Sequence, residues 1–240
     1  MLTQIRKDLR ALENTSRAFV LGDFFKTDAG GYGEGDQFLG LTVPQTRSIA
    51  KRYRGTSLAD SMKLLKSPWH EERLLALYFM VDLFKRGDEK TKAQVYNAYM
   101  KNTKFVNNWD LVDSSAHLIT GPFLEKRPRK ILYEFAKSKD LWKRRIAVVA
   151  TFHFIRQKDF KDILALSKLL LKDDQDLMHK ATGWMLREMG KRELAPLHQF
   201  LRRHAWEMPR TMLRYSIEKL PINERQFYMK QKALRDSKSL

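Results

Sequence analysis

The chain has 240 residues, contains no cysteine, and carries 46 Lys and Arg against 28 Asp and Glu, for a formal net charge of +18. The missing cysteines exclude disulfides, thiolate zinc sites and thiol nucleophiles, and the six histidines lack the spacing of metal ligands. A positive surplus spread along the chain favours a polyanionic partner, most commonly nucleic acid, over a merely soluble basic surface. We expect no metal and no other cofactor.

We expect no secretory signal peptide at the start of this sequence. Its first 15 residues mix charges with isolated apolar positions and lack the apolar core of a signal peptide. The Gly-rich segment 28–40 follows, in which Gly35 and Gly40 have P-loop spacing. Leu41 and Thr42 then stand where a P-loop requires Lys and Ser or Thr. We therefore expect a flexible loop that a ligand orders, with Tyr32 as its first aromatic residue.

The remaining chain is predicted to be helical. Leu, Lys, Arg, Ala and Met dominate segments of about 10–18 residues, the length of ordinary helices. The breaks between these segments fall near 28–40, 54–57, 66–68, 86–88, 120–122, 126–128, 138–140, 172–175 and 220–222. The longest apolar stretch, Ile146 to Ile155, is too short to span a bilayer and indicates a buried helix.

Five of these helices open in a similar way, each with a large apolar residue. The openings lie 40, 33, 36 and 30 residues apart, at Trp69, Trp109, Trp142, Met178 and Met208. A period of this length is typical of HEAT-like repeats, whereas an irregular helical bundle is the alternative. The fold prediction is an all-α superhelical solenoid of HEAT-like antiparallel helix pairs. It forms a single domain over 1–230, followed by a polar, basic tail at 231–240.

In such a solenoid the second helix of each pair lines the concave face, and we expect that face to be basic. The helices in question carry basic residues at Arg73, Arg144, Arg145, Lys180, Arg187, Arg210 and Arg214. The second of the five carries Asp113 instead. A cationic surface with one carboxylate is a plausible cradle for DNA with one place for chemistry.

Trp109 and Asp113 are four residues apart and so lie on one face of their predicted helix. Taken alone, Asp113 is more simply a solvated residue or the cap of a local kink near Ser114 and Ser115. Trp109 and Trp184 are, by the same reasoning, more simply core residues. The glycine before Trp184 indicates close packing.

Three segments together resemble the AlkD-like family of HEAT-repeat alkylpurine DNA glycosylases. They are Asn108-Trp109-Asp110-Leu111-Val112-Asp113, Leu141-Trp142-Lys143-Arg144-Arg145-Ile146-Ala147 and Lys180-Ala181-Thr182-Gly183-Trp184-Met185-Leu186-Arg187-Glu188. The loop from Tyr32 to Gly40 also fits the early loop of many members. The resemblance covers roughly residues 5–230.

The resemblance implies a monofunctional glycosylase that removes cationic N3- or N7-alkylated purines from duplex DNA. It implies that Asp113 is the catalytic carboxylate and that Trp109 and Trp184 are aromatic walls beside the deoxyribose. Arg145 matches the arginine that holds the DNA backbone, and we expect Tyr32 of the early loop to contact DNA. Arg144, Lys180, Arg187, Arg210 and Arg214 are the further DNA contacts that we expect.

The chemistry fits the lack of metal ligands and of an activated nucleophile. A cationic alkylpurine has a weak glycosidic bond and leaves as a neutral base, so no strong general acid is needed. A preorganised carboxylate stabilises the positive charge that grows on the sugar, and aromatic faces attract the same charge.

Two other functions fit the sequence less well. One is a non-catalytic protein of the same repeat type that binds damaged or branched DNA. The other is a protein-interaction solenoid that binds acidic peptides. Neither needs a carboxylate between aromatic residues. We further expect a monomer that does not enter membranes and lies in the cytoplasm, associated with the nucleoid if the source is bacterial.

Overall fold

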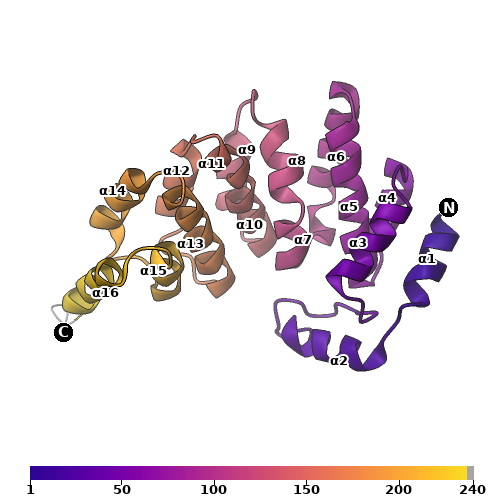
Figure 1. Ribbon diagram of the computed structural model, residues 1–240, viewed down its shortest axis with the longest axis horizontal. Helices are drawn as coiled ribbons and strands as arrows, with labels where there is room; N and C mark the ends of the chain where they lie inside the picture. The colour runs from indigo at the N-terminus through magenta and orange to yellow at the C-terminus, as the bar shows by residue number, and fades with distance from the viewer. Residues whose placement is uncertain (237–240) are drawn as a thin grey trace. The chain divides into compact units, whose positions relative to one another are not determined.

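The computed structural model of the protein describes residues 1–236, and the described part contains helices but no strands (Figure 1). The all-α prediction is therefore confirmed. Contacts divide the chain into two compact units, Met1–Phe123 and a second unit that starts at Leu124, and each is described by itself. Of the predicted tail, residues 231–236 continue the last helix, and 237–240 lie outside the described residues.

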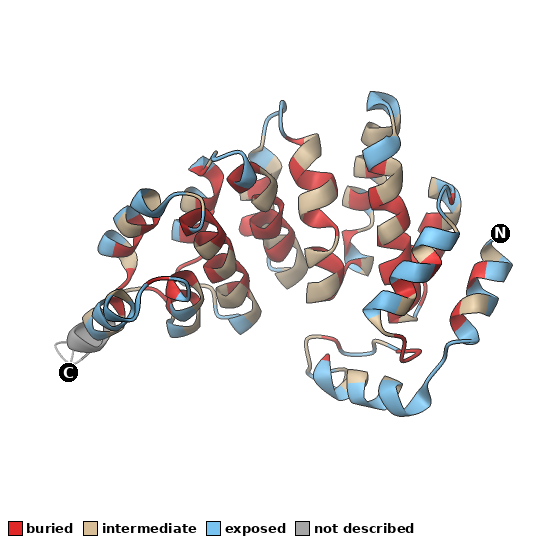
Figure 2. Ribbon diagram, viewed as in Figure 1, coloured by how far each residue is buried: buried red, intermediate tan, exposed pale blue. Residues whose placement is uncertain are grey.

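The first unit is a row of short helices. It contains α1 (Leu2–Arg10), α2 (Thr15–Phe24), α3 (Val43–Arg52), α4 (Leu58–Leu65), α5 (His70–Arg86), α6 (Glu89–Lys101), the 3-10 turn η1 (Thr103–Phe105), α7 (Trp109–Asp113) and α8 (Ala116–Phe123). The central helix is α5, against which α3, α4, α6, α7 and α8 pack. Most of its residues are buried, as Figure 2 shows in red.

The second unit repeats this arrangement. It contains α9 (Lys130–Ala136), α10 (Leu141–Ala150), α11 (Phe152–Arg156), α12 (Lys161–Leu169), α13 (Asp176–Gly190), α14 (Leu194–His204), α15 (Arg210–Ile217) and α16 (Ile222–Asp236). Its central helix is α13, which packs against α10, α11, α12, α14 and α15. Packing between helices that are neighbours in sequence is the pattern of a helical solenoid.

Local signals explain where several helices begin. Asn14, Ser57 and Asp88 cap α2, α4 and α6 by accepting a backbone N–H of the first turn. Thr42 and Gln45 form a capping box at α3. The five predicted openings fall within two residues of the starts of α5, α7, α10, α13 and α15. In this chain, a large apolar residue at these positions therefore marks the starts of α5, α7, α10, α13 and α15.

Several helix boundaries differ from the prediction, which has no breaks at 11–14, 157–160 and 191–193, where the structure has them. The expected break at 120–122 is wrong, because α8 continues through Pro122 to Phe123. The chain turns earlier instead, at Ser114 and Ser115, where the Ser115 hydroxyl donates to the Leu111 carbonyl oxygen at 2.6 Å. Likewise, the apolar stretch that predicts one buried helix is divided at Thr151 between α10 and α11. Hydroxyl groups that bond back to the preceding turn favour such bends.

None of the helices in residues 1–236 combines the length and the apolar character that a bilayer crossing requires.

Candidate active site

Helix α7 places the two predicted catalytic residues of the first unit beside one groove. Asn108 caps the helix by accepting the Trp109 N–H at 2.8 Å, and the helix ends after Asp113. Trp109 and Asp113, one turn apart, both line a groove of about 740 Å³. Their predicted position on one face is consistent with this placement.

The groove combines an aromatic wall with basic residues. Phe24 and Phe25 line it beside Trp109, whose ring stacks on Phe25 with a centroid distance of 5.2 Å. Its basic lining residues come from three helices, at Arg17, Arg47 and Lys85. The acidic ones are Asp110 and Asp113. Cations around an aromatic wall suit a ligand that carries phosphates and a planar ring.

A buried ionic cluster lies behind this groove, and the sequence analysis missed it. The His70 imidazole bonds Asp36 Oδ2 through Nδ1 at 2.7 Å and Asp110 Oδ2 through Nε2 at 2.8 Å. Arg73 donates to Asp36 Oδ1 at 2.6 Å, and Asn108 donates to Asp36 Oδ2 at 3.4 Å. The cluster therefore joins the start of α5, the early loop and α7. The sequence feature that indicates this cluster is the charged run at 70–73, at the start of the otherwise apolar helix α5.

The cluster shifts the protonation of its members. Burial disfavours the charge on His70, but Asp110 and Asp36 outweigh this effect and raise the pKa of His70 to about 9. Burial also disfavours the charge on Asp36, yet His70 and Arg73 lower the pKa of its carboxyl below the ordinary value. Both groups are therefore charged at neutral pH.

The early loop is fixed by the protein itself. The buried Glu71 carboxylate accepts the backbone N–H groups of Leu39, Gly40 and Leu41 at 2.9–3.1 Å. The Tyr32 hydroxyl donates to the Phe24 carbonyl oxygen at 3.1 Å. Hydrogen bonds within the protein therefore hold the loop at Tyr32 and at 39–41. Tyr32, half-buried, belongs to the first unit and does not line the groove.

Trp184, the third predicted catalytic residue, belongs to the second unit. It lies half-buried in the middle of α13, and its ring centroid is 5.9 Å from that of Phe152. Gly183 before it faces α15, where an added Cβ would lie 2.5 Å from the Met212 carbonyl oxygen. The close packing predicted from this glycine is confirmed. Within the first unit, the structure brings Trp109 and Asp113 to one groove.

Replacement of Gly183 by Ala is expected to lower the free energy of unfolding by about 1–3 kcal/mol, because the new methyl group meets backbone and must separate α13 from α15. Urea denaturation measures the loss. Gly22→Ala, in the exposed helix α2, meets only the Thr27 hydroxyl, 3.1 Å away, and serves as the control. Equal stability of the Gly183 variant and the wild type would contradict the close packing.

The predicted DNA-binding residues of the second unit have different environments. Arg144 forms an ion pair with Asp173 at 2.7 Å, and the buried Arg145 donates to the Leu177 carbonyl oxygen at 2.6 Å. Lys180 pairs with Asp176 at 2.8 Å, and Arg187 pairs with Glu218. Arg210 and Arg214 are exposed and line a groove of about 810 Å³ together with Arg225 of α16.

Arg73 does not fit the expected basic face. Its side chain is 5% exposed and binds Asp36 and the carbonyl oxygens of Ser67 and Pro68. The expectation that it contributes to a DNA cradle is therefore wrong. A guanidinium that satisfies buried acceptors cannot turn to a phosphate without leaving them unpaired.

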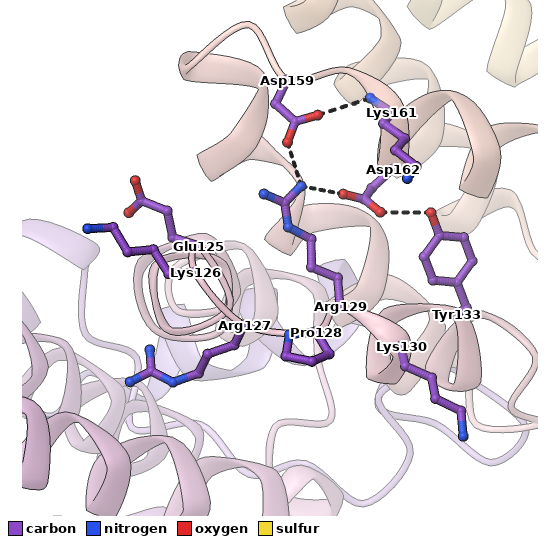
Figure 3. Close-up of a pocket in the computed structure, with 10 residues that line it drawn as sticks. All are labelled: Glu125, Lys126, Arg127, Pro128, Arg129, Lys130, Tyr133, Asp159, Lys161 and Asp162. Atoms are coloured by element: carbon purple, nitrogen blue, oxygen red, sulfur yellow. Dashed lines mark hydrogen bonds and ion pairs between the residues drawn. The ribbon is translucent and has the colours of Figure 1, made fainter.

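Another hollow of the second unit, of about 550 Å³, is drawn in Figure 3. Arg129 stands at its centre and bonds both Asp159 and Asp162 at 2.6 Å, while Tyr133 donates to Asp162 at 2.7 Å. The Arg129 guanidinium also lies 3.6 Å from the ring centroid of Phe154. These contacts hold α9 against α12, so the residues that line the hollow have a structural role.

Variants of Arg210 and Arg214 test the exposed basic groove. Each change to Ala is expected to weaken duplex DNA binding and to reduce the slope of log K against log salt by about 0.9, the share of one phosphate contact. Titrations at several salt concentrations measure the slope. Lys168→Ala, which removes an exposed charge from α12, is the control. An unchanged slope in both arginine variants would assign these residues no phosphate contact.

Comparisons with known proteins identify a shared fold and a family. A search of curated proteins gives no match. The chain is similar to a solved structure described as a predicted DNA alkylation repair enzyme from Enterococcus faecalis. The two share 14% sequence identity and a TM-score of 0.69, over 88% of this chain and 97% of that chain. At this identity the likeness shows a common fold.

The family relationship comes from the sequence itself. The sequence model of the family described as DNA alkylation repair enzyme matches residues 5–220, which include α7, α10 and α13. The three segments that carry the resemblance in the sequence analysis lie on these helices. The chain therefore belongs to the DNA alkylation repair enzyme family.

Proposed function

We propose that the protein is a monofunctional DNA glycosylase that hydrolyses the N-glycosidic bond of cationic N3- or N7-alkylated purines in duplex DNA. The observation that supports this most is the groove of the first unit, where a carboxylate and an indole stand one helical turn apart. Asp110 of that groove is bound to His70. Asp113 is the other carboxylate of its lining.

The proposed reaction breaks the bond between C1′ of the deoxyribose and the purine nitrogen. The bonding electrons leave with the base, which becomes neutral, and positive charge develops on the sugar ring. The Asp113 carboxylate stabilises this charge electrostatically, and the faces of Trp109 and Trp184 add cation–π attraction. A water molecule then adds its oxygen to C1′ and loses its proton to solvent.

Basic residues supply the binding to DNA in this proposal. Arg17, Arg47 and Lys85 line the groove and are placed to attract phosphates beside the lesion. In the second unit the exposed Arg210 and Arg214 are the proposed direct contacts, with Tyr32 added from the first unit. Four further proposed contacts would exchange acceptors within the protein for phosphates: Arg144, Arg145, Lys180 and Arg187. The net charge of +18 supports a large electrostatic share of the affinity.

The decisive experiment is a base-release assay on duplex DNA that contains N7-methylguanine, at saturating enzyme so that binding does not limit the rate. The proposal predicts release of the free base without strand cleavage. A neutral lesion should be a poor substrate, because the mechanism provides no group that protonates a leaving base. Binding without release would instead support the non-catalytic DNA binder.

A further inference from the structure

The His70 ring is placed to carry two protons. Each of its nitrogens faces a carboxylate oxygen, at 2.7 Å and 2.8 Å, and a carboxylate can only accept. Both nitrogens must therefore donate, which only the imidazolium can do. With His70 charged, the two carboxylates, Asp36 and Asp110, balance the two cations, His70 and Arg73, in a cluster whose side chains are 1–15% exposed.

A series of aromatic rings connects the same imidazolium to Trp109. His70 stacks on Phe38 with a centroid distance of 4.5 Å, Phe38 on Phe25 at 5.0 Å, and Phe25 on Trp109 at 5.2 Å. The planes of successive rings lie 17–22° apart. Because Phe25 and Phe38 are buried, a shift of the His70 ring is transmitted to the indole by packing.

Helix α7 is short, and its position depends on the packing of the buried Leu111 and Val112 and on the contacts of the ionic cluster. It has five residues and ends where the chain bends at Ser114 and Ser115, and so short a helix gains little stability from its own hydrogen bonds. His70 restrains it twice, through the Asp110 carboxylate and through the ring of Trp109. Asp113 follows Asp110 by one turn and moves with it.

We propose that His70 is a positioning residue for base excision, whose imidazolium clamps α7 through Asp110 and the aromatic series so that Trp109 and Asp113 stand correctly in the groove. This inference rests on the proposed glycosylase function. His70 lies outside the groove lining, so its role is exerted through α7.

The clamp depends on the charge of His70 and hence on pH. The charged groups that face the imidazole are Asp36 from the loop and Asp110 from α7, while Arg73 of its own helix acts through Asp36. The loop and the end of α2 contribute Phe38 and Phe25. Loss of the proton removes one of the two carboxylate bonds, so the clamp should open above neutral pH.

The first test is single-turnover release of N7-methylguanine by His70→Gln and Asp110→Asn at saturating enzyme. We expect both rates to fall on the order of tenfold to a hundredfold, the effect of a catalytic group displaced by about an ångström, with unchanged affinity for undamaged duplex. Leu64→Ala, a core change in α4, is the control for lost stability and should retain the wild-type rate. Wild-type rates in both cluster variants, with an active native enzyme, would overturn the inference and leave the proposed function intact.

The pH profile separates positioning from mere stability. The wild-type rate should decline as pH rises through about 9, where His70 loses its proton. In Asp110→Asn the decline should begin at lower pH, because one stabilising carboxylate is gone, and His70→Gln should show no such decline. Identical profiles in all three proteins would contradict the clamp.

A measurement that does not require activity completes the test. The ¹⁵N-indole NMR signal of Trp109, assigned with Trp109→Phe, should shift as His70 titrates, whereas His70→Gln should abolish the shift. A Trp109 signal that does not respond to His70 would overturn the inference even if the native protein released no base. Absence of base release with a responsive indole would count against the proposed glycosylase alone.

Discussion

Replacement of Asp113 by Asn is expected to slow single-turnover release of N7-methylguanine on the order of tenfold to a thousandfold, the range for loss of one electrostatic contact to a transition state. The amide keeps the shape and the hydrogen-bonding capacity of the side chain but removes its negative charge. DNA binding and folding should therefore be close to those of the wild type. The measurement is the rate of base release at saturating enzyme, with stability followed by urea denaturation.

The matched control is Asp60→Asn, the same chemical change in the same unit but outside the groove, where Asp60 pairs with Lys63 on α4. It should leave the rate unchanged. The rate of base release should fall less in Trp184→Ala than in Asp113→Asn, since a cation–π contribution is about 1–2 kcal/mol. A wild-type rate for Asp113→Asn would contradict the proposed mechanism, because the other carboxylate of the groove lining, Asp110, is bound to His70.

The helical architecture could be predicted because its signals are local. Large apolar residues recur at the openings of α5, α7, α10, α13 and α15, and these helices begin within two residues of where the sequence predicts. The break between α7 and α8 was harder to predict, since it depends on the Ser115 hydroxyl and not on glycine or proline. Pro122 misled the prediction, because proline usually ends a helix, whereas α8 continues through it to Phe123.

The candidate site was predictable only in part. Trp109 and Asp113 share a helix, so their spacing of four residues predicts a common face. The ionic cluster behind them joins Asp36, His70 and Asp110, which are 34 and 40 residues apart in sequence. No local pattern connects such residues, because their contact depends on how α5, the loop and α7 pack. The same reason explains why Arg73 is buried with Asp36 although its helix position predicts a basic surface.

Replacement of Asp36 by Ala is expected to lower the free energy of unfolding by about 3–5 kcal/mol, the cost of removing one partner from a buried ionic group. The Asp36 carboxylate is 1% exposed and accepts hydrogen bonds from His70, Arg73 and Asn108. Without it, two cations remain buried beside a single carboxylate, Asp110. Urea denaturation of the wild type and the variant at pH 7 measures the difference.

The pH dependence of this difference identifies its electrostatic origin. The pKa of His70 is raised from its ordinary value of 6.5 to about 9, so its charge stabilises the wild type fully below pH 6.5, and this contribution is lost as pH rises through about 9. The pKa of Asp36 is lowered, so its contribution is present above the ordinary value of 3.8 and is lost as pH falls through the lower, folded-state pKa. The difference in the free energy of unfolding between the wild type and Asp36→Ala should therefore be largest near pH 5–7 and decrease towards pH 10. The loss of stability in Asp60→Asn, which leaves the cluster intact, should not narrow towards pH 10. A loss in Asp36→Ala that widened towards pH 10 would mean that His70 is neutral in the folded protein.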